Sequence, residues 1–339
     1  MSKKRTFVSI DDIINEPYGY TYKEISECMG ESEAKRMFFS LYKEKNKNQH
    51  QTIKIHSVNK DGTGTQKYVF KLSDNNYIET VSIKRRNGTT ACVSTMVGCP
   101  VGCIFCESGS NGFIRNLTPS EIVQQVVLLP KDVNRIVFMG MGEPLFNYDS
   151  LIKSIHILRD RNGLDFSTSG ITISTVGPLN QLKKLREEHI KIQLTLSLHA
   201  TTQKVRNMII PNMAKSDVNS TVESMLSYSE RHNRKITIAY LLIPGVNDKV
   251  SDVDKLIKWF YGKNVMINLL QYNPTNCGKF KRPNKQMLSD FKMKLEKGGL
   301  YVKIRESKGT NINAACGQLV SEYNKKKNPD SKKNANTCK

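Results

Sequence analysis

The stretch Gly98-Cys99-Pro100-Val101-Gly102-Cys103-Ile104-Phe105-Cys106 decides the organisation of this chain. Its three cysteines follow one another at spacings of four and three residues, in a segment that also contains two glycines and one proline. Glycine allows tight, irregular backbone, so a loop of this composition can turn all three sulfur atoms toward one point. Three convergent thiolates favour a soft metal centre made of iron or zinc.

The number of cysteines favours iron over zinc. Structural zinc sites usually take four protein ligands from two closely spaced pairs, and the chain has no second CxxC pair. Ferredoxin-type clusters use four cysteines at other spacings. Three cysteines would leave one iron of a 4Fe-4S cluster open to another molecule. A buried trio of unrelated cysteines is the alternative, and the tight spacing disfavours it.

Composition and charge limit the remaining possibilities. The 339 residues are enough for one large domain and a smaller module. We find no apolar run of membrane-spanning length and no signal-peptide core, and eight cysteines without a secretion signal predict a cytoplasmic protein with no membrane contact. The net charge is +21, and about +17 of it lies before Ser321, so nucleic acid is the expected partner. A lysine-rich protein without such a partner is the alternative.

Residues 86–320 alternate between strand and helix patterns, which predicts a parallel sheet with helices outside it. The pattern favours an α/β fold, a partial (β/α)6 barrel. The predicted strands are Ala91–Ser94, Arg135–Met139, Gly170–Ser174, Ile192–Ser197, Lys235–Leu242, Met266–Tyr272 and Tyr301–Arg305; the predicted helices are Ser120–Leu129, Asp149–Asp160, Pro178–Glu188, Val218–Asn233, Val250–Tyr261 and Asn284–Lys297.

Two further regions flank this core. Residues 1–85 predict a separate N-terminal α+β module, with helices at Ser9–Ile14 and Tyr22–Lys43 and strands at Thr52–His56, Lys67–Leu72 and Tyr77–Lys84. Residues 321–339 carry six lysines and predict a basic, disordered tail.

Small polar residues and glycines follow several of the predicted strands. Barrel enzymes build their sites at such strand ends, so we expect one common site here. The candidates for ligand contacts are Gly140, Gly142, Glu143, Ser174, Ser197, Leu198, His199 and Asn273. Each of them alone is equally typical of a turn, a cap or, for His199, a structural histidine.

The cluster loop resembles that of the radical S-adenosylmethionine (SAM) enzymes, and several motifs resemble the RlmN/Cfr family of RNA-methylating members. These motifs are Cys92-Val93-Ser94, Gly112 to Thr118, Phe138 to Leu145, Ser197-Leu198-His199, Pro244 to Asp248 and Ala314 to Leu319. The resemblance runs from about Ile78 to Leu319.

The resemblance implies a 4Fe-4S cluster on Cys99, Cys103 and Cys106, and SAM contacts from Gly142, Glu143, Ser174, Ser197 to His199, and Asn273. It also implies that one SAM methylates Cys316 and that a second yields a 5′-deoxyadenosyl radical. The radical then takes a hydrogen from that methyl group, and the methylene group adds to an adenine ring carbon. Cys92 would release the product by forming a transient disulfide with Cys316, and Glu79 would be the general base.

The implied substrate is an adenosine of 23S rRNA, with tRNA as a second candidate. An electron donor such as flavodoxin or ferredoxin is implied, and we expect a monomer. Glu143-Pro144 and Gly112-Phe113 favour methylation at carbon 2, whereas Ala239-Tyr240 and Gln271 to Pro274 favour carbon 8, the reaction of the Cfr type that confers antibiotic resistance. Carbon 2 is preferred.

Two features depart from the family pattern. Glu107 and Ser108 stand where a small residue and a threonine are usual, and the N-terminal module barely resembles the family's RNA-binding domain. A radical SAM enzyme with a non-RNA substrate and a non-catalytic iron–sulfur RNA-binding protein therefore remain alternatives. No role is assigned to Cys28, Cys277 or Cys338.

Overall fold

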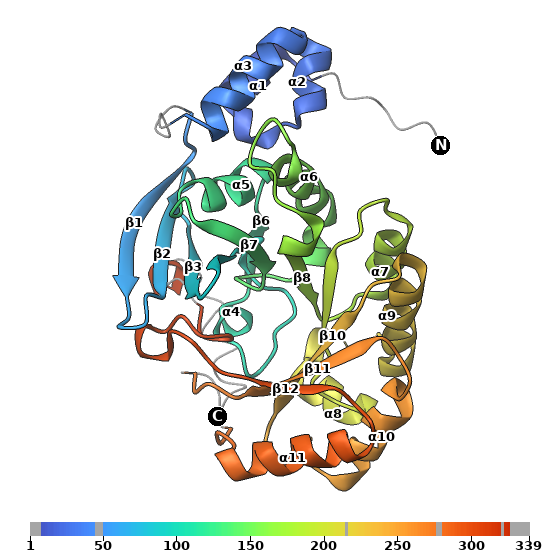
Figure 1. The fold of residues 1–339 in the computed structure, drawn as a ribbon. Coiled ribbons are helices and arrows are strands. Elements are labelled where there is room, and N and C mark those ends of the chain that lie inside the picture. The colour runs from blue at the N-terminus through green and yellow to red at the C-terminus, as the bar shows by residue number, and fades with distance from the viewer. Residues whose placement is uncertain (1–7, 45–49, 214–215, 276–279, 320–321, 326–339) are drawn as a thin grey trace.

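A single ten-stranded sheet runs through the molecule in the order β1-β2-β3-β4-β7-β8-β9-β10-β11-β12 (Figure 1). The computed structural model describes residues 8–44, 50–213, 216–275, 280–319 and 322–325. A separate two-stranded ribbon, β5 (Met96–Gly98) with β6 (Phe113–Asn116), encloses the three-cysteine loop.

The parallel part of the sheet confirms the predicted partial barrel. Seven strands pair in parallel, and a helix follows each of the first six on the outside of the sheet (Figure 1). The strands are β4 (Gly88–Cys92), β7 (Val133–Phe138), β8 (Ile171–Thr175), β9 (Gln193–Ser197), β10 (Ile236–Leu242), β11 (Val265–Gln271) and β12 (Val302–Arg305). The helices are α5 (Pro119–Val127), α6 (Tyr148–Arg159), α7 (Leu179–Glu187), α9 (Val218–His232), α10 (Val250–Phe260) and α11 (Lys285–Lys297), with a short α8 (Gln203–Ile209) before α9.

Local sequence explains why these elements begin where they do. Thr118 caps α5 by accepting from the backbone N–H of Glu121, the Glu121 side chain accepts in return from the Thr118 N–H, and Pro119 opens the helix. The strands are rich in buried aliphatic residues, as parallel strands covered on both faces must be. Leu194 and Leu196 of β9 are examples, with at most 2% of their surface exposed.

The N-terminal strands do not form the separate small sheet that the sequence predicts. Strands β1 (Ile53–Lys60), β2 (Gln66–Leu72) and β3 (Tyr77–Arg85) pair antiparallel with one another, and β3 pairs antiparallel with β4. They therefore extend the barrel sheet, and the sheet is continuous across the boundary expected near residue 85. The alternation pattern identified the strands but carries no information on their partner.

The predicted helix over Tyr22–Lys43 is two helices, α2 (Tyr22–Met29) and α3 (Glu31–Tyr42), because Gly30 between them adopts φ +90°. With α1 (Ile10–Asn15) they form a small bundle above α5 and α6 (Figure 1). Its own core is Ile13, Ile25, Ala34 and Phe38.

The predicted tail is partly ordered. A short helix, α12 (Glu322–Lys325), packs on the N-terminal strands, where the side chain of Asn324 bonds both backbone groups of Tyr77. Residues 326–339, including Cys338, lie outside the described part of the chain, as does Cys277. Within the described residues, no helix is long and apolar enough to cross a membrane.

Candidate functional site

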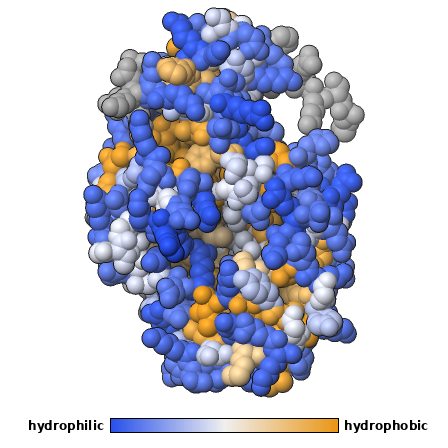
Figure 2. Space-filling model, in the orientation of Figure 1, coloured by the Kyte–Doolittle hydropathy of each residue, from blue (hydrophilic) through white to orange (hydrophobic). Residues whose placement is uncertain are grey.

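A cavity of about 200 Å³ lies at the carboxyl ends of the parallel strands, under the three-cysteine loop. It brings together every predicted site residue except Glu79 and Leu198: Cys92, Cys99, Cys103, Cys106, Gly142, Glu143, Ser174, Ser197, His199, Asn273 and Cys316. These residues come from sequence positions more than 200 apart, and the fold gathers them around one cavity at the strand ends, where the sequence predicts a site. We call this cavity the barrel pocket. In Figure 2 the surrounding face of the molecule is mostly hydrophilic.

The cysteine loop is held by backbone bonds at both of its ends. The Cys99 N–H donates to the Gly112 carbonyl at 2.9 Å, and Gly98 adopts φ +76° with its α-carbon packed against that same carbonyl. At the far end, the Ile104 N–H donates to the carbonyl of Ile209 at 3.1 Å, which ties the loop to α8.

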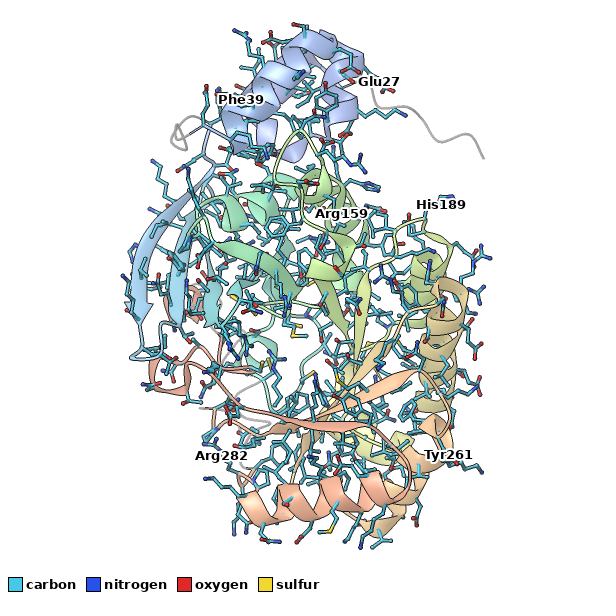
Figure 3. All side chains as sticks on the ribbon, in the orientation of Figure 1. Glu27, Phe39, Arg159, His189, Tyr261 and Arg282 are labelled. Carbon is cyan, nitrogen blue, oxygen red and sulfur yellow. The ribbon has the colours of Figure 1, made fainter. Side chains whose placement is uncertain are left out.

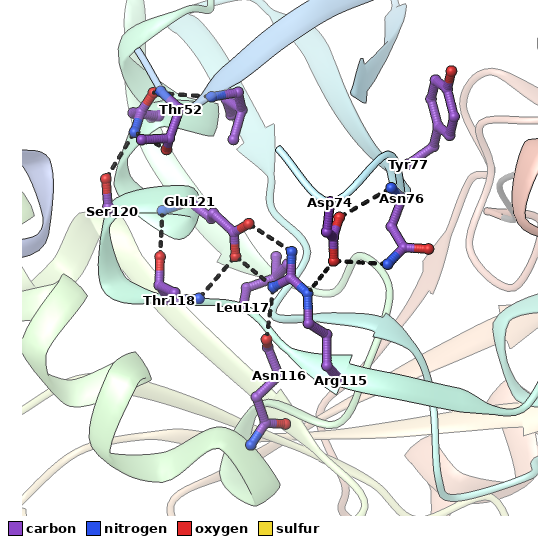
Figure 4. Close-up of polar contacts among 12 residues, drawn as sticks. Thr52, Asp74, Asn76, Tyr77, Arg115, Asn116, Leu117, Thr118, Ser120 and Glu121 are labelled. Carbon is purple, nitrogen blue, oxygen red and sulfur yellow. Dashed lines mark hydrogen bonds and ion pairs between the residues drawn. The ribbon is translucent and has the colours of Figure 1, made fainter. Parts of the chain in front are cut away.

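An ion-pair network anchors the ribbon that carries the loop (Figure 4). Arg115 of β6 binds both carboxylate oxygens of Glu121 at 2.7 and 2.8 Å, and its Nε donates to Asp74 at 2.6 Å. These contacts raise the pKa of Arg115 and lower the pKa of Asp74 to about 2, although burial acts in the opposite direction on each. Bidentate Arg–carboxylate geometry makes this link between β6, α5 and the β2–β3 turn directional.

The three loop cysteines fit an iron–sulfur cluster by their chemistry. All of them are free thiols, and burial raises the pKa of each above that of an exposed thiol. Thiols with raised pKa values release protons when they bind metal. No three His, Cys, Asp or Glu side chains among the described residues lie close enough to share a single ion. In a four-iron cluster each cysteine binds a different iron, so the three sulfur atoms need not converge on a single ion.

Arg206 is a charged residue of this site that the sequence analysis missed. Its side chain is completely buried on α8, where it donates to the Leu198 carbonyl at 2.6 Å and to the Val176 carbonyl. Its Nε has no hydrogen-bond partner within the described chain. Burial lowers the pKa of Arg206 to about 10, while the proximity of Cys103 and Glu143 acts to raise it. The guanidinium remains a cation beneath the cysteine loop, and a lone arginine in an amphipathic pattern gives no signal of this in the sequence.

Glu143 is fully engaged with its own chain. Oε1 accepts from the Thr175 hydroxyl at 2.6 Å and from the Leu145 N–H at 3.0 Å, and Oε2 accepts from the Val176 N–H at 2.8 Å. Burial outweighs these bonds and raises the pKa of Glu143 to about 7. The side chain therefore joins the ends of β7 and β8 and shapes the floor of the barrel pocket.

His199 is a buried, neutral ring. Its Nδ1 accepts from the Leu241 N–H at 3.0 Å, which assigns the ring proton to Nε2. Burial lowers its pKa to about 3, and the nearby Arg206 lowers it further. Its backbone adopts φ +54°, and Phe105 of the cysteine loop packs edge-on against the ring at 5.2 Å. The residue supports the wall of the pocket, and the adjacent Leu198 is buried in the main core and accepts from Arg206 through its carbonyl.

The opposite wall of the pocket carries small polar groups and an unused acceptor. Ser174 and Ser197 share a hydrogen bond of 3.3 Å. Asn273 donates from Nδ2 to the Cys316 carbonyl at 3.2 Å, while its Oδ1 is buried without a hydrogen-bond partner within the described chain. A buried acceptor of this kind costs about 1–3 kcal/mol unless a donor fills it. Beside three thiols, it fits a bound molecule with N–H or O–H groups, as the amino and hydroxyl groups of SAM provide.

Cys92 and Cys316 face the same cavity as the loop cysteines. Cys92 ends β4 and is buried, which raises its pKa to about 12; the proximity of Cys316 adds to the shift and that of Arg305 opposes it. Cys316 is itself exposed, on the loop after β12 whose residues Ala314 and Ala315 are buried. The two are free thiols within mutual electrostatic range and are more than 200 residues apart in sequence.

The residues that depart from the family pattern hold this second loop in place. The Glu107 N–H donates to the Gly317 carbonyl at 2.8 Å, and the Ser108 hydroxyl donates to the Leu319 carbonyl at 2.6 Å. Both lie on α4 (Glu107–Ser110), directly after Cys106. They connect the two cysteine loops to each other.

Glu79 does not line the barrel pocket. It faces a neighbouring cavity of about 590 Å³, together with Lys67, Glu107, Pro274 and Gln318. Lys67 forms an ion pair with its carboxylate at 3.4 Å, and the two side chains are only 11% and 5% exposed. We call this space the outer cavity. Gln318, on the loop that carries Cys316, donates to the Pro274 carbonyl at 3.1 Å, and both residues line the outer cavity.

The sequence has two basic runs, Lys84-Arg85-Arg86 and Lys279-Phe280-Lys281-Arg282, and their described residues have different contacts. Arg85 lines the barrel pocket, whereas Lys84 pairs with Asp132 and Arg282 binds Gln271. Lys279 lies outside the described residues. Cys28 packs in the N-terminal bundle, where its thiol donates to the Val8 carbonyl at 3.5 Å.

Comparisons with known proteins agree with this geometry. The family model of the radical SAM superfamily matches residues 93–260. A probable RNA methyltransferase of Rhodopseudomonas palustris is 46% identical over 258 residues, which cover 76% of this chain and 72% of that protein. A probable dual-specificity RNA methyltransferase RlmN of Thermotoga neapolitana is 43% identical over 260 residues, which cover 76% of both chains.

A solved structure extends the likeness to the whole fold. The crystal structure of a radical SAM methyltransferase from Sphaerobacter thermophilus superposes with a TM-score of 0.85 at 30% identity, covering 89% of this chain and 98% of the other. By sequence, fold and site, the chain belongs to the RlmN/Cfr family of radical SAM RNA methyltransferases.

Proposed function

We propose that this enzyme methylates a ring carbon of an adenosine in 23S rRNA, with carbon 2 as the favoured position and tRNA as a second substrate. The observation that carries the proposal is that Cys92 and Cys316 share the barrel pocket with Cys99, Cys103 and Cys106. A methyl cation donor cannot react directly at a non-nucleophilic ring carbon, and two extra cysteines beside a radical source offer another route. The names of the curated relatives and the charge of +21 support an RNA substrate.

Cys99, Cys103 and Cys106 would hold the cluster, and Asn273 Oδ1 would accept from a donor group of SAM. Bound there, the cluster and SAM supply the 5′-deoxyadenosyl radical. The contacts of Glu143 with Thr175 and Val176 make it a positioning residue for the strand ends that surround SAM.

Cys316 would carry the methyl group on its sulfur, and the carbon of that group would bond to the adenine ring. The radical adduct would give up one electron, which the oxidised cluster would accept, and its ring proton to Glu79. The Cys92 thiolate would then attack the Cys316 sulfur: a disulfide forms, the Cys316 S–C bond breaks with its electron pair going to the carbon, and a proton taken up by that carbon completes the methyl group of the released base. The raised pKa of Cys92 means that it must lose its proton at this step, because the thiolate is the attacking species. Glu79 lies in the outer cavity, so its role requires the target base to reach across the wall at Gln318.

The decisive experiment incubates reconstituted enzyme with SAM, a reductant and fragments of 23S rRNA or tRNA. Mass spectrometry of the digested RNA should give 2-methyladenosine; 8-methyladenosine would instead favour the Cfr type of reaction. Mass spectrometry of the protein should find a methyl group on Cys316 in wild type and none in Cys316→Ala. If neither the RNA nor Cys316 gains a methyl group, the scheme is wrong.

A further inference from the structure

Three aromatic rings gather at one end of the N-terminal strands, beside the outer cavity. His56 of β1 lies 5.1 Å from Tyr77 of β3 and 4.8 Å from Tyr323 of α12, centroid to centroid, both edge-on. Tyr77 and Tyr323 stack at 4.7 Å with 29° between their planes. Tyr323 is 47% exposed. His56 and Tyr323 are exposed and Tyr77 is half-buried, so ring edges and one stacked tyrosine pair are open to a partner.

The fold holds this cluster in place. Asn324 accepts from the Tyr77 N–H at 3.0 Å and donates to the Tyr77 carbonyl at 2.8 Å, and only 7% of its surface is exposed. These two bonds pin α12 to the end of β3 and press Tyr323 against Tyr77. In Figure 4, which shows Tyr77 labelled, its ring points away from the polar network around Arg115.

The strand register places positive charge next to the rings. Lys54 of β1 pairs with Lys71 of β2, which in turn pairs with Tyr77 of β3, so Lys–Lys–Tyr form one row across the sheet. Both lysines are exposed. Like charges directly opposite each other destabilise a sheet, and an anion bound between them would offset that cost.

The same face leads from this row to the reaction site. The next row contains Val69 and Glu79, and the one after it contains Lys67, Val81 and Cys92. Residues four positions apart on a strand are separated by roughly 13 Å. The outer cavity lies along this face and is lined by both Glu79 and Tyr323.

Among the side chains that the structure describes, the acidic groups on this face are paired or enclosed. Glu79 pairs with Lys67, Asp74 with Arg115, and Asp61 accepts from Thr63 and Thr65 in the β1–β2 turn. Glu107, on the cavity wall, is buried. The exposed charge beside the rings is therefore positive.

We propose that His56, Tyr77 and Tyr323 form a stacking platform for an unpaired base of the RNA next to the target nucleotide, with Lys54 and Lys71 on its phosphates. The inference rests on the RNA substrate proposed above. Single-stranded nucleic acid is bound by aromatic faces beside a basic track, and a base taken out of its stack is reached more easily when its neighbours are held. The row spacing brings such a neighbour within reach of Glu79 and Cys92.

The test measures binding of fluorescein-labelled RNA to the reconstituted full-length enzyme by anisotropy. One probe is a hairpin with an adenosine-containing single-stranded loop, and the other is a fully paired duplex. Tyr323→Ala should weaken binding to the loop by about 5- to 100-fold, with a smaller effect on the duplex, and Tyr323→Phe should bind as wild type does. Tyr261→Ala is the matched control, because Tyr261 is 70% exposed on the side of the molecule opposite β1 (Figure 3).

A second pair of variants tests the two lysines and leaves the ring of Tyr323 in place. Lys54→Ala and Lys71→Ala should each reduce the slope of log affinity against log salt by about one. Equal loop binding by wild type and Tyr323→Ala, together with unchanged salt slopes, would overturn the platform while leaving the methylation of RNA intact. Failure of wild type to bind or methylate any RNA would overturn the proposed substrate itself.

Discussion

The backbone N–H of Glu107 donates to the carbonyl of Gly317 at 2.8 Å. One of these residues follows Cys106, the last cysteine of the three-cysteine loop, and the other follows Cys316. A single hydrogen bond therefore joins the loop that would hold the cluster to the loop that would carry the methyl group. Because a backbone group makes it, side-chain identity at position 107 does not reveal it in the sequence.

The neighbouring side-chain tether can be removed by mutation. Ser108→Ala deletes the 2.6 Å bond to the Leu319 carbonyl and should cost about 1 kcal/mol, because that carbonyl is left without its donor. Hydrogen exchange of residues 309–319 should become faster, and the rate of RNA methylation should fall several-fold. Ser110→Ala is the control, since the Ser110 hydroxyl bonds within α4 at 2.8 Å to Glu107. Equal exchange rates in both variants would argue against a tether.

Buried Arg206 should set the electrostatics of the cluster. Replacing it by Leu removes a cation near Cys103 together with its hydrogen bonds to the carbonyls of Val176 and Leu198. We expect the cluster's reduction potential to become more negative by tens of millivolts, about the effect of one unit charge at an effective dielectric near 20. Arg206→Lys should keep most of the potential but lose stability. Redox titration followed by electron paramagnetic resonance measures this directly, and an unchanged potential in Arg206→Leu at full iron content contradicts it.

Because of Glu143, we expect the free energy of unfolding of the cluster-free protein to depend on pH. Its folded pKa of about 7 exceeds the ordinary value of 4.5, so its stabilising contribution is complete below pH 4.5 and is lost as the pH rises through 7. The loss amounts to about 3 kcal/mol by pH 8. His199 acts in the opposite direction, since its pKa of about 3 means that stability is lost as the pH falls below 6.5.

Comparing wild type with Glu143→Gln isolates the carboxyl from this background. The difference in free energy of unfolding between them, from urea titrations at several pH values, should shift by about 3 kcal/mol in favour of the variant between pH 4.5 and 8. A difference that stays constant with pH would mean that Glu143 does not titrate in this range.

Some of the fold was predictable because it depends on local pattern, and some was not because it depends on pairing. The parallel strands from Arg135 onward were found within a few residues, since buried aliphatic runs alternate with capped amphipathic helices. The attachment of β3 to β4 was missed, because a strand's own alternation does not name its neighbour. Gly30 divides a predicted helix in two because it adopts a positive φ, and the sequence pattern did not predict that conformation.

The candidate site was also predictable only in part. The spacing of Cys99, Cys103 and Cys106 predicted one centre, and the structure gathers all three at one pocket. Arg206 has no motif, and its importance comes from burial beneath that loop. Glu79 lines the outer cavity and Cys316 lines the barrel pocket, and the order of residues along the chain does not show that the two are separate.

The ion pair between Lys67 and Glu79 should matter for both stability and turnover. Lys67→Met leaves a buried carboxylate without its cation, and removing one partner of a buried pair typically costs about 3–5 kcal/mol. We expect a lower urea midpoint and slower RNA methylation, while methylation of Cys316 itself proceeds as in wild type because that pocket is separate. The double variant Lys67→Met with Glu79→Gln should recover part of the stability without recovering RNA methylation. If the double variant were as unstable as Lys67→Met, the cost would not lie in the unpaired charge.

Gly98 gives the sharpest test of the loop geometry. A β-carbon there would lie 2.0 Å from the Gly112 carbonyl oxygen, on backbone that cannot rotate away, and φ is +76°. Gly98→Ala should therefore cost more than about 3 kcal/mol and strip most iron from the reconstituted protein, since Cys99 is the next residue. Gly262→Ala is the matched control: its φ is +70°, but nothing lies within 4 Å of the added carbon, so only the backbone strain of about 1–2 kcal/mol applies. Thermal unfolding and iron content measured on both variants separate contact from strain, and equal losses in the two would show that the Gly112 contact is not what Gly98 protects.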